Sequence, residues 1–248
     1  MPSSGARSLS PGPTGPNWSR GALPMPDAPI LPSPILKPAA LFDFDGTLIG
    51  CDSLLVLLGH TCRRFPRALG SLGPLAAAVP AFIAGRISRD ALKESALGVL
   101  RHVPTGHRED FFADFCRRSL APRLRPQGLR RIEWHREQRH LLVLVSASID
   151  HYLRPVSTRL GFDHLVCTRV ILDPSPHLDG LNCRGDEKVR RLLQEPFSSA
   201  IRWEESWAYG DSLADLPLLK RCGHPVAVRP ASSLRRRALQ FGWTILDW

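Results

Sequence analysis

Short apolar runs alternate with helical patterns along most of this chain. The runs are a few residues long and apolar almost throughout, which predicts strands buried on both faces; they cover residues 39–42, 141–145, 164–172, 206–209, 225–228 and 243–246. Helical patterns lie between them, beginning at Leu54, covering 129–140, 186–195 and 233–242, and ending at Gly161 and Gly223. Such alternation indicates an α/β fold with a doubly wound, mostly parallel sheet, that is, a Rossmann-like core covered by helices.

Residues 61–122 break this alternation. The segment has helical patterns throughout and no strand candidate, so we predict a helical cap inserted into a core that consists of residues 37–60 and 123–248. Residues 1–36 are rich in Pro, Ser and Gly and have no apolar period, which predicts a disordered tail. Met25 in this tail is an alternative start site, and the tail lacks the apolar centre of a signal peptide.

One stretch of the predicted cap, residues 68–86, follows Arg67 and carries no charge before Arg86. A membrane-spanning helix needs about 20 apolar residues, and Pro74 and Pro80 interrupt this stretch, so a stable span is not expected. We favour a hairpin that is buried within the cap. The alternative is a segment that enters a membrane interface, with the arginines beside the lipid headgroups.

The net charge of +10 comes almost entirely from arginine, because only four of the 33 basic residues are lysines. Positive charge favours anionic partners such as a phosphorylated metabolite, nucleic acid or a lipid surface, although a bias in composition explains it as well. No basic run is interleaved with aromatic residues, which argues against a nucleic-acid interface. The six cysteines form no C-x-x-C pair, so we expect reduced thiols and a cytoplasmic location.

Two carboxylates come directly after the first apolar run, in the sequence Asp43-Phe44-Asp45-Gly46-Thr47. If extended geometry persists past the strand, the side chains of Asp43 and Asp45 lie on the same side. One carboxylate can then attack phosphorus, while the other protonates the leaving oxygen and later activates water. Two adjacent carboxylates repel one another unless a cation lies between them, and Mg²⁺ is the usual cation beside phosphates. Gly46 permits the tight turn that exposes both groups.

Polar residues also follow two other predicted strands. Ser146 ends the second apolar run, and Asp211 follows Gly210 at the end of a later one. Ligands of parallel α/β sheets bind at the carboxyl ends of the strands. We therefore expect these residues to meet Asp43 at one edge of the sheet.

With these motifs the chain resembles the haloacid dehalogenase superfamily, whose first motif is D-x-D-G-T. Ser146 is similar to the second motif, a hydroxyl that hydrogen-bonds a phosphoryl oxygen. Lys188 matches the third motif, a lysine that neutralises charge on the nucleophile and the phosphate. Gly210 to Asp215 matches the fourth motif, G-D-S-x-x-D, and the resemblance covers about residues 39–248.

The resemblance implies the catalytic and metal-binding roles. Asp43 is the expected nucleophile, Asp45 the general acid and base, and Lys188 the cation that stabilises the transition state. Mg²⁺ is expected between Asp43, Asp211 and the backbone carbonyl of Asp45.

The remaining motif residues have supporting or substrate-binding roles by the same resemblance. The supporting group orients the metal or Lys188, and it consists of Asp215, Gly210 and Ser212. The expected substrate-binding group is Ser146, Ala147, Thr47 and Asp52.

Within the superfamily, the chain is most similar to the phosphoserine-phosphatase-like subfamily, which carries its cap between motifs one and two. Asp52 lies where those enzymes carry an acidic group that meets the substrate amine. The second motif departs from theirs, since it reads Ser146-Ala147-Ser148 in place of S-G-G. The subfamily also uses a cap arginine; the candidates here are Arg63, Arg64, Arg67, Arg86 and Arg89. In character, the arginine-flanked apolar stretch is similar to that of bacterial phosphatidylglycerophosphate phosphatases.

Together these features predict a Mg²⁺-dependent phosphomonoester hydrolase that acts through an aspartyl phosphate on a small metabolite such as phosphoserine. A lipid phosphatase at the membrane surface, with residues 68–86 as a peripheral contact at the inner membrane face, is a second hypothesis. Two further hypotheses stay open: a phosphotransferase on the same scaffold, and a non-catalytic protein that binds anions or nucleic acid.

Overall fold

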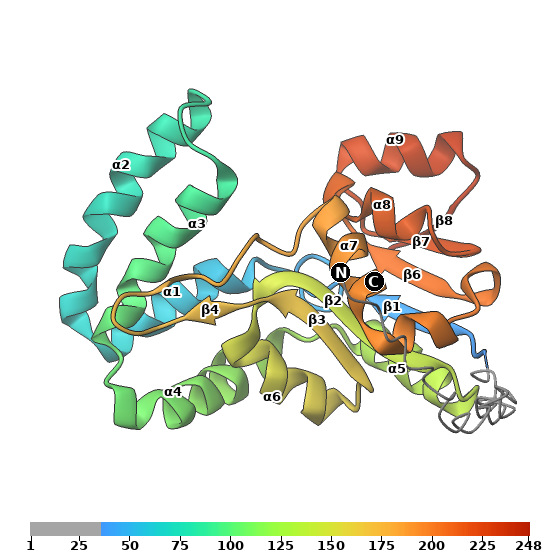
Figure 1. The fold of residues 1–248 in the computed structure, drawn as a ribbon, viewed down its shortest axis with the longest axis horizontal. Helices are drawn as coiled ribbons and strands as arrows, with labels where there is room; N and C mark the ends of the chain where they lie inside the picture. The colour runs from blue at the N-terminus through green and yellow to red at the C-terminus, as the bar shows by residue number, and fades with distance from the viewer. Residues whose placement is uncertain (1–35) are drawn as a thin grey trace, which may run out of the picture. The chain divides into compact units, whose positions relative to one another are not determined.

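The central element of the structure is a parallel sheet of six strands in the order β3-β2-β1-β6-β7-β8 (Figure 1). The computed structural model describes residues 36–248. The strands of this sheet are β1 (Ala39–Phe42), β2 (Leu141–Ile149), β3 (His164–Thr168), β6 (Trp207–Gly210), β7 (His224–Val228) and β8 (Thr244–Leu246). Every neighbouring pair is parallel, which confirms the predicted α/β class.

The apolar run of β1 is explained by its central position. Successive residues of a strand point to opposite faces of the sheet. Ala40 and Phe42 therefore pack into the apolar layer on one face, while Ala39 and Leu41 pack into the layer on the other. All four residues are fully buried. A strand covered on both faces has no position for a polar side chain until it ends at Asp43.

Helices cover both faces of the sheet. One apolar layer contains residues of α5 (Pro126–Glu137) and α6 (Asp150–Leu160), together with residues of the predicted cap. The other layer contains residues of α7 (Asp186–Gln194), α8 (Leu216–Leu219) and α9 (Ser232–Gln240). Short 3₁₀ helices complete this part of the chain: η6 (Pro196–Ala200), η7 (Trp203–Glu205) and η8 (Leu213–Asp215).

Between β1 and α5 the described chain forms helices and no strand. These elements are α1 (Ser53–Arg64), η1 (Pro66–Ser71), α2 (Leu72–Ile83), α3 (Arg89–Leu97), η2 (Gly98–His102), η3 (Thr105–His107), α4 (Arg108–Phe115), η4 (Cys116–Leu120) and η5 (Ala121–Arg123). We call residues 61–122 the cap, as predicted; its boundaries stay a prediction. The predicted disordered tail lies outside the described residues, apart from Leu36.

Helix α3 joins the cap to the core through hydrogen bonds on one of its faces. Asp90 Oδ2 accepts the backbone N–H of Asn182 at 3.2 Å, and Glu94 Oε1 accepts that of Leu178 at 3.1 Å. Between them, Lys93 Nζ donates to Asn182 Oδ1 at 2.9 Å. The spacing of three and four residues places these side chains on the same side of the helix.

Two expectations from the sequence are wrong. The predicted strand 164–172 ends at Thr168, because β2 ends where α6 begins and offers β3 no further partner. The next residues form β4 (Val170–Ile171), which pairs antiparallel with β5 (His177–Leu178) outside the main sheet. The apolar hairpin expected to be buried in the cap is not, since no residue of α2 is buried.

A buried histidine links α5 to the sheet. His135 is fully buried, its Nε2 lies 2.8 Å from Tyr209 Oη, and its Nδ1 lies 2.8 Å from His140 Nδ1. Burial lowers the pKa of His135 to about 3. The folded protein therefore holds His135 neutral under conditions in which the unfolded chain protonates it.

We predict that this histidine makes stability depend on pH. An unfolded histidine titrates near pH 6.5, so between about pH 6.5 and 3 the unfolded state binds a proton that the folded state does not. Lowering the pH from about 7.5 to 5.5 should therefore reduce the free energy of unfolding, by about 1 kcal/mol for His135 alone. Urea denaturation at several pH values measures this.

The substitution His135→Gln keeps a group that can bond Tyr209 but does not titrate, and it should reduce the pH-dependent loss by that amount. His107→Gln, at an exposed histidine of the cap, is the matched control and should leave the loss unchanged. An unchanged pH dependence in His135→Gln would contradict the prediction.

Candidate active site

Three carboxylates meet at the carboxyl ends of β1 and β6. Asp43 follows β1 and donates its backbone N–H to Tyr209 O of β6 at 3.0 Å, so the two strand ends are held side by side. Asp211 follows β6, and Asp215 lies in η8 directly after it. Carboxylate oxygens of Asp43, Asp211 and Asp215 lie within 4.8 Å of one another. Pairing of β1 with β6 thus gathers groups that are far apart in the sequence.

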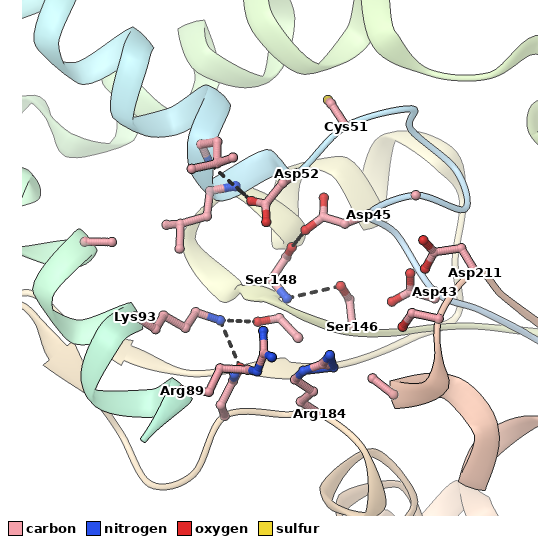
Figure 2. A pocket seen from close by; sticks show the side chains of 18 of the residues that line it. Asp43, Asp45, Cys51, Asp52, Arg89, Lys93, Ser146, Ser148, Arg184 and Asp211 are labelled. Atoms are coloured by element: carbon pink, nitrogen blue, oxygen red, sulfur yellow. Dashed lines mark hydrogen bonds between the residues drawn. The ribbon is translucent and has the colours of Figure 1, made fainter. Parts of the chain in front are cut away.

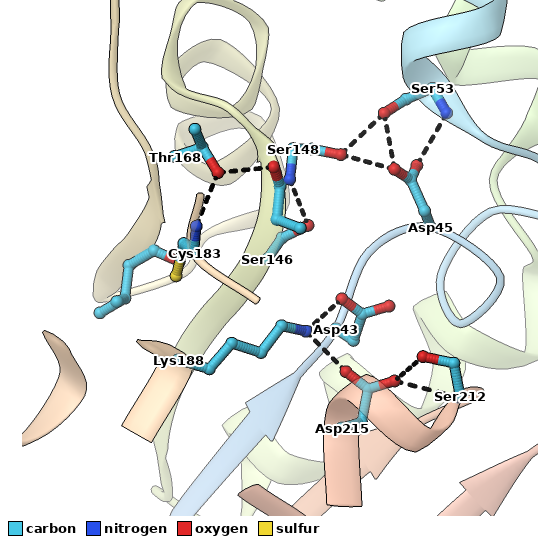
Figure 3. A network of polar contacts seen from close by, with 12 residues as sticks. Asp43, Asp45, Ser53, Ser146, Ser148, Thr168, Cys183, Lys188, Ser212 and Asp215 are labelled. Atoms are coloured by element: carbon cyan, nitrogen blue, oxygen red, sulfur yellow. Dashed lines mark hydrogen bonds and ion pairs between the residues drawn. The ribbon is translucent and has the colours of Figure 1, made fainter. Parts of the chain in front are cut away.

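Lys188 of α7 lies between two of these carboxylates (Figure 3). Its Nζ donates to Asp43 Oδ1 and to Asp215 Oδ1, both at 2.6 Å, and the side chain is buried. Burial disfavours the ammonium, but Asp215 and Asp43 outweigh this effect and raise the pKa of Lys188. The other oxygen of Asp215 accepts the backbone N–H and the hydroxyl of Ser212, at 3.0 and 2.9 Å, which fixes its orientation.

The carboxylate of Asp45 is held by hydroxyl groups. It accepts the backbone N–H of Ser53 at 2.9 Å, the Ser53 hydroxyl at 3.0 Å and the Ser148 hydroxyl at 2.6 Å (Figure 3). Tyr152 Oη lies 2.6 Å from Ser53 Oγ and extends this network. Burial raises the pKa of Asp45 to about 6, although the bond from Ser148 opposes the rise. A carboxyl group with such a pKa can both give and take a proton near neutral pH.

Burial also acts on the carboxylates beside Lys188. It raises the pKa of Asp43, and Lys188 opposes that rise. Burial and the neighbouring Asp215 raise the pKa of Asp211 to about 6. These carboxylates are therefore costly to keep ionised unless a further cation compensates them.

A cavity of about 550 Å³ opens above these groups (Figure 2). Asp43, Asp45, Lys188 and Asp211 line its catalytic end. The opposite walls come from α1 and the cap and are largely apolar: they carry Leu54, Leu55 and Leu58 of α1, Leu75 and Val79 of α2, and Leu92 and Ala96 of α3. The cavity is therefore charged at one end and largely apolar on the opposite walls.

Three cations also line the cavity: Arg89 and Lys93 of α3 and Arg184 of the segment before α7 (Figure 2). Within residues 36–248, no carboxylate forms an ion pair with any of them. Burial lowers the pKa of Lys93 to about 8. Of the five cap arginines suggested by the sequence, Arg89 is the one that lines this cavity. Cations without carboxylate partners make this side of the cavity suited to an anion.

The second-motif residues also line the cavity. Ser146 Oγ accepts the backbone N–H of Ser148 at 3.1 Å, which leaves the Ser146 hydroxyl hydrogen free to donate. The carbonyl of Ala147 accepts the Thr168 hydroxyl at 2.7 Å and also accepts Lys93. This part of β2 is therefore hydrogen-bonded both to the cap, through Lys93, and to the core, through Thr168.

Three further residues predicted for the site, Asp52, Thr47 and Gly210, lie in different environments. Asp52 lines the cavity, but its Oδ1 accepts the backbone N–H groups of Leu54 and Leu55 as the N-cap of α1. Thr47 is fully buried, and its hydroxyl has no hydrogen-bond partner in the described part of the chain. Neither Thr47 nor Gly210 lines the cavity. Their functional roles stay predictions.

Sequence reasoning missed Ser53, Ser148, Lys93 and Arg184 as site residues. Ser148 was visible as the third residue of the second motif, and Arg184 lies four residues before Lys188. Nothing in the sequence singled out Ser53 or Lys93, because Ser53 contacts Asp45 only once α1 is in place and Lys93 lines the cavity from the cap.

The donor set fits a hard divalent cation. Four aspartates, Asp43, Asp45, Asp211 and Asp215, line the catalytic end, and Lys188 contacts two of them. Among the described residues, Asp211 has no cationic partner within ion-pair distance. All available ligand atoms are oxygens, which suits Mg²⁺ better than softer metals.

Comparison with known proteins agrees with this geometry. The family of haloacid dehalogenase-like hydrolases matches residues 40–220. A histidinol-phosphatase of Neisseria meningitidis serogroup C is 25% identical over 230 residues, which cover 86% of this chain and 100% of that protein.

Two solved structures share the fold. A protein with unknown function from Bordetella pertussis Tohama I has a TM-score of 0.72 at 25% identity, covering 86% of this chain and 99% of that one. A substrate-bound phosphoserine phosphatase has a TM-score of 0.59 at 16% identity, covering 86% of this chain and 93% of that one. At that identity the second likeness supports the fold alone.

With the family matched over most of the chain, this protein belongs to the haloacid dehalogenase-like hydrolases. Within that family it is a phosphatase.

Gly46 lets the first motif approach Asp211, and we predict that Gly46→Ala disrupts the site. Gly46 has φ +78°, and an added methyl group would coincide with the Asp211 carboxylate. Displacing a catalytic group by about 1 Å can lower activity on the order of 100-fold. Hydrolysis of an aryl phosphate by the variant measures this loss.

Gly85→Ala is the matched control. Gly85 has φ +69°, so it shares the backbone strain, but an added methyl group would have no neighbour within 4 Å. It should lose roughly 1 kcal/mol of stability and keep its activity. Equal activity losses in the two variants would show that contact with Asp211 is not the cause.

Proposed function

We propose that this protein hydrolyses a phosphomonoester through an aspartyl phosphate formed on Asp43, with Mg²⁺ as its cofactor. The observation that carries the proposal is the arrangement of Asp43, Asp45, Lys188 and Asp211 at one end of a cavity. Each group there has a different environment, and these environments suit different chemical roles.

Two displacement steps at phosphorus account for hydrolysis. A carboxylate oxygen of Asp43 bonds to phosphorus while the bond from phosphorus to the substrate oxygen breaks, and Asp45 gives that oxygen its proton. Asp45, now ionised, takes a proton from water, and the water oxygen bonds to phosphorus as the bond to Asp43 breaks. The products are an alcohol and inorganic phosphate, and both aspartates return to their starting states.

Neighbouring residues position these groups and offset their charge. Lys188 holds Asp43 in place and opposes the negative charge that develops around phosphorus. Ser53 and Ser148 orient Asp45. Ser146 is free to donate its hydroxyl hydrogen to a phosphoryl oxygen.

Asp43 and Asp211, with the backbone carbonyl of Asp45, are the residues that would hold Mg²⁺. When bound, the ion supplies positive charge that neutralises the phosphate and the surrounding carboxylates. Asp215 would support the site through Lys188 and Ser212.

The cavity supports a small phosphorylated metabolite as substrate. Only one carboxylate oxygen of Asp52 accepts the N-terminal N–H groups of α1, so the other oxygen is available to a substrate. Arg89 and Arg184 offer positive charge in the same cavity. Phosphoserine and, from the Neisseria relative, histidinol phosphate are the first compounds to test. The apolar wall supports the second candidate, a phosphatidylglycerophosphate-type lipid phosphatase. A cytoplasmic location and peripheral membrane contact stay predictions.

We predict that Asp43→Asn abolishes turnover and leaves the fold intact. The amide cannot attack phosphorus, so aryl phosphate hydrolysis should fall at least about 1,000-fold, as for the loss of other nucleophiles. Asp45→Asn should instead slow breakdown of the intermediate, so that phosphate from a labelled substrate stays on the protein in a form released by hydroxylamine. Circular dichroism checks the fold of both variants.

Asp247→Asn, at an exposed carboxylate far along the chain, is the matched control and should behave as the wild type. Normal activity in Asp43→Asn would exclude the mechanism. Transfer of phosphate to added alcohols in place of water would favour a phosphotransferase.

The substrate and the cofactor are tested together by phosphate release, with Mg²⁺ or with EDTA. The panel should contain phosphoserine, histidinol phosphate, sugar phosphates, nucleotides and phosphatidylglycerophosphate in detergent micelles. EDTA should abolish release, and added Mg²⁺ should restore it. If no substrate gives Mg²⁺-dependent release, including an aryl phosphate, the protein is better explained as a non-catalytic binder of anions.

A further inference from the structure

Helix α2 exposes an unusually apolar surface. Its sequence, LGPLAAAVPAFI, contains no charged and no hydrogen-bonding side chain, and none of its residues is buried. Ile83 at its end is 79% exposed and Val79 is 41% exposed, while Leu69 just before it is 58% exposed. The helix lies beside α3 and follows η1 (Figure 1).

Such a helix is normally covered by something. A helix that is apolar on all sides is usually found inside a protein or a membrane, since exposure of apolar surface to water is unfavourable. A contiguous exposed apolar patch therefore marks an interaction surface. In the described part of the chain, α3 and η1 are the main neighbours of α2; Leu72 and Leu75 pack partly against the core, but no residue of the helix is buried.

The charges around α2 indicate what covers it. Arg63, Arg64 and Arg67 precede the helix and Arg86 follows it, while Arg89 lines the cavity. The sequence from Ser53 to Arg89 contains no aspartate or glutamate. None of the four arginines outside the cavity forms an ion pair within residues 36–248. An apolar surface bordered by such arginines matches the interface of a membrane with anionic headgroups.

A second copy of the chain is a poorer match. Pairing two α2 surfaces would bring the arginines of both copies together, with no acidic residue in the same segments to compensate them. A membrane instead offers acyl chains to the helix and phosphates to the arginines.

Helix α2 is suited to lie in the interface and not to cross the bilayer. Its 12 residues span about 18 Å as an α-helix, whereas the hydrocarbon core is about 30 Å thick. No helix among residues 36–248 is long and apolar enough to cross a membrane.

We propose that α2, with the arginines at its two ends, docks this protein on the surface of membranes that contain anionic phospholipid. The same helix contributes Leu75 and Val79 to the lining of the cavity, to which the exposed Leu55 of α1 also belongs. Docking would therefore place the apolar side of the cavity against the lipid. If the proposed phosphatase function holds, a phosphomonoester with an apolar chain would enter along this wall.

Co-sedimentation of the full chain with vesicles tests the proposal. The vesicles contain either phosphatidylcholine alone or phosphatidylcholine with phosphatidylglycerol. The protein should bind the anionic vesicles at least about tenfold more tightly than the neutral ones, and added salt should weaken that binding.

Two variants locate the surface. Leu69→Glu with Ile83→Glu places two acidic groups on the exposed patch without changing the cavity wall, and it should lower vesicle binding about tenfold or more. Leu239→Glu changes a leucine of α9 that is 67% exposed, and as the control it should bind like the wild type.

Hydrolysis of a soluble aryl phosphate is measured in parallel and should be equal in all these proteins. This readout separates the docking proposal from the proposed function, because loss of hydrolysis in the wild type contradicts the function alone.

Three results would overturn docking: no preference for anionic vesicles, equal loss of binding in the two variants, or a dimer in light scattering that the double variant dissociates. The last result would assign α2 to a second copy of the chain.

Discussion

Repulsion among buried carboxylates is the constraint on which this site depends. Asp43, Asp45, Asp211 and Asp215 share one end of the cavity, and Lys188 contacts two of them, Asp43 and Asp215. Isolated from water, such a cluster would favour protonated acids and an inert site. Hydrogen bonds to the acids and the buried Lys188 oppose this, and a bound divalent cation would oppose it further.

The parallel sheet makes this concentration of charge possible. A strand that is apolar throughout can be buried on both faces, and its first polar residue then falls at the carboxyl end. Because β1 lies between β2 and β6, the ends of three such strands are brought together by backbone pairing alone. The core thus supplies the aspartates and Lys188, and α1 together with the cap supplies the opposite walls of the cavity.

The sequence predicted those features that follow from local pattern. Buried strands are continuous apolar runs, so the class of fold and the positions of Asp43, Ser146 and Asp211 could be predicted from the sequence. The split of the strand 164–172 could not, because it depends on where β2 stops offering a partner. The exposure of α2 was also hidden, since an apolar sequence does not reveal whether anything packs against it.

One serine links the helix that leads into the cap to the candidate site. Ser53 is the first residue of α1, the helix that leads into the cap, and it also holds the carboxylate of Asp45 through its backbone and its side chain. The start of α1 and the position of the Asp45 carboxylate are therefore not independent. A chimera that exchanged caps to change specificity would have to keep α1 through this first turn, because a junction placed before Ser53 would replace part of the catalytic apparatus together with the cap.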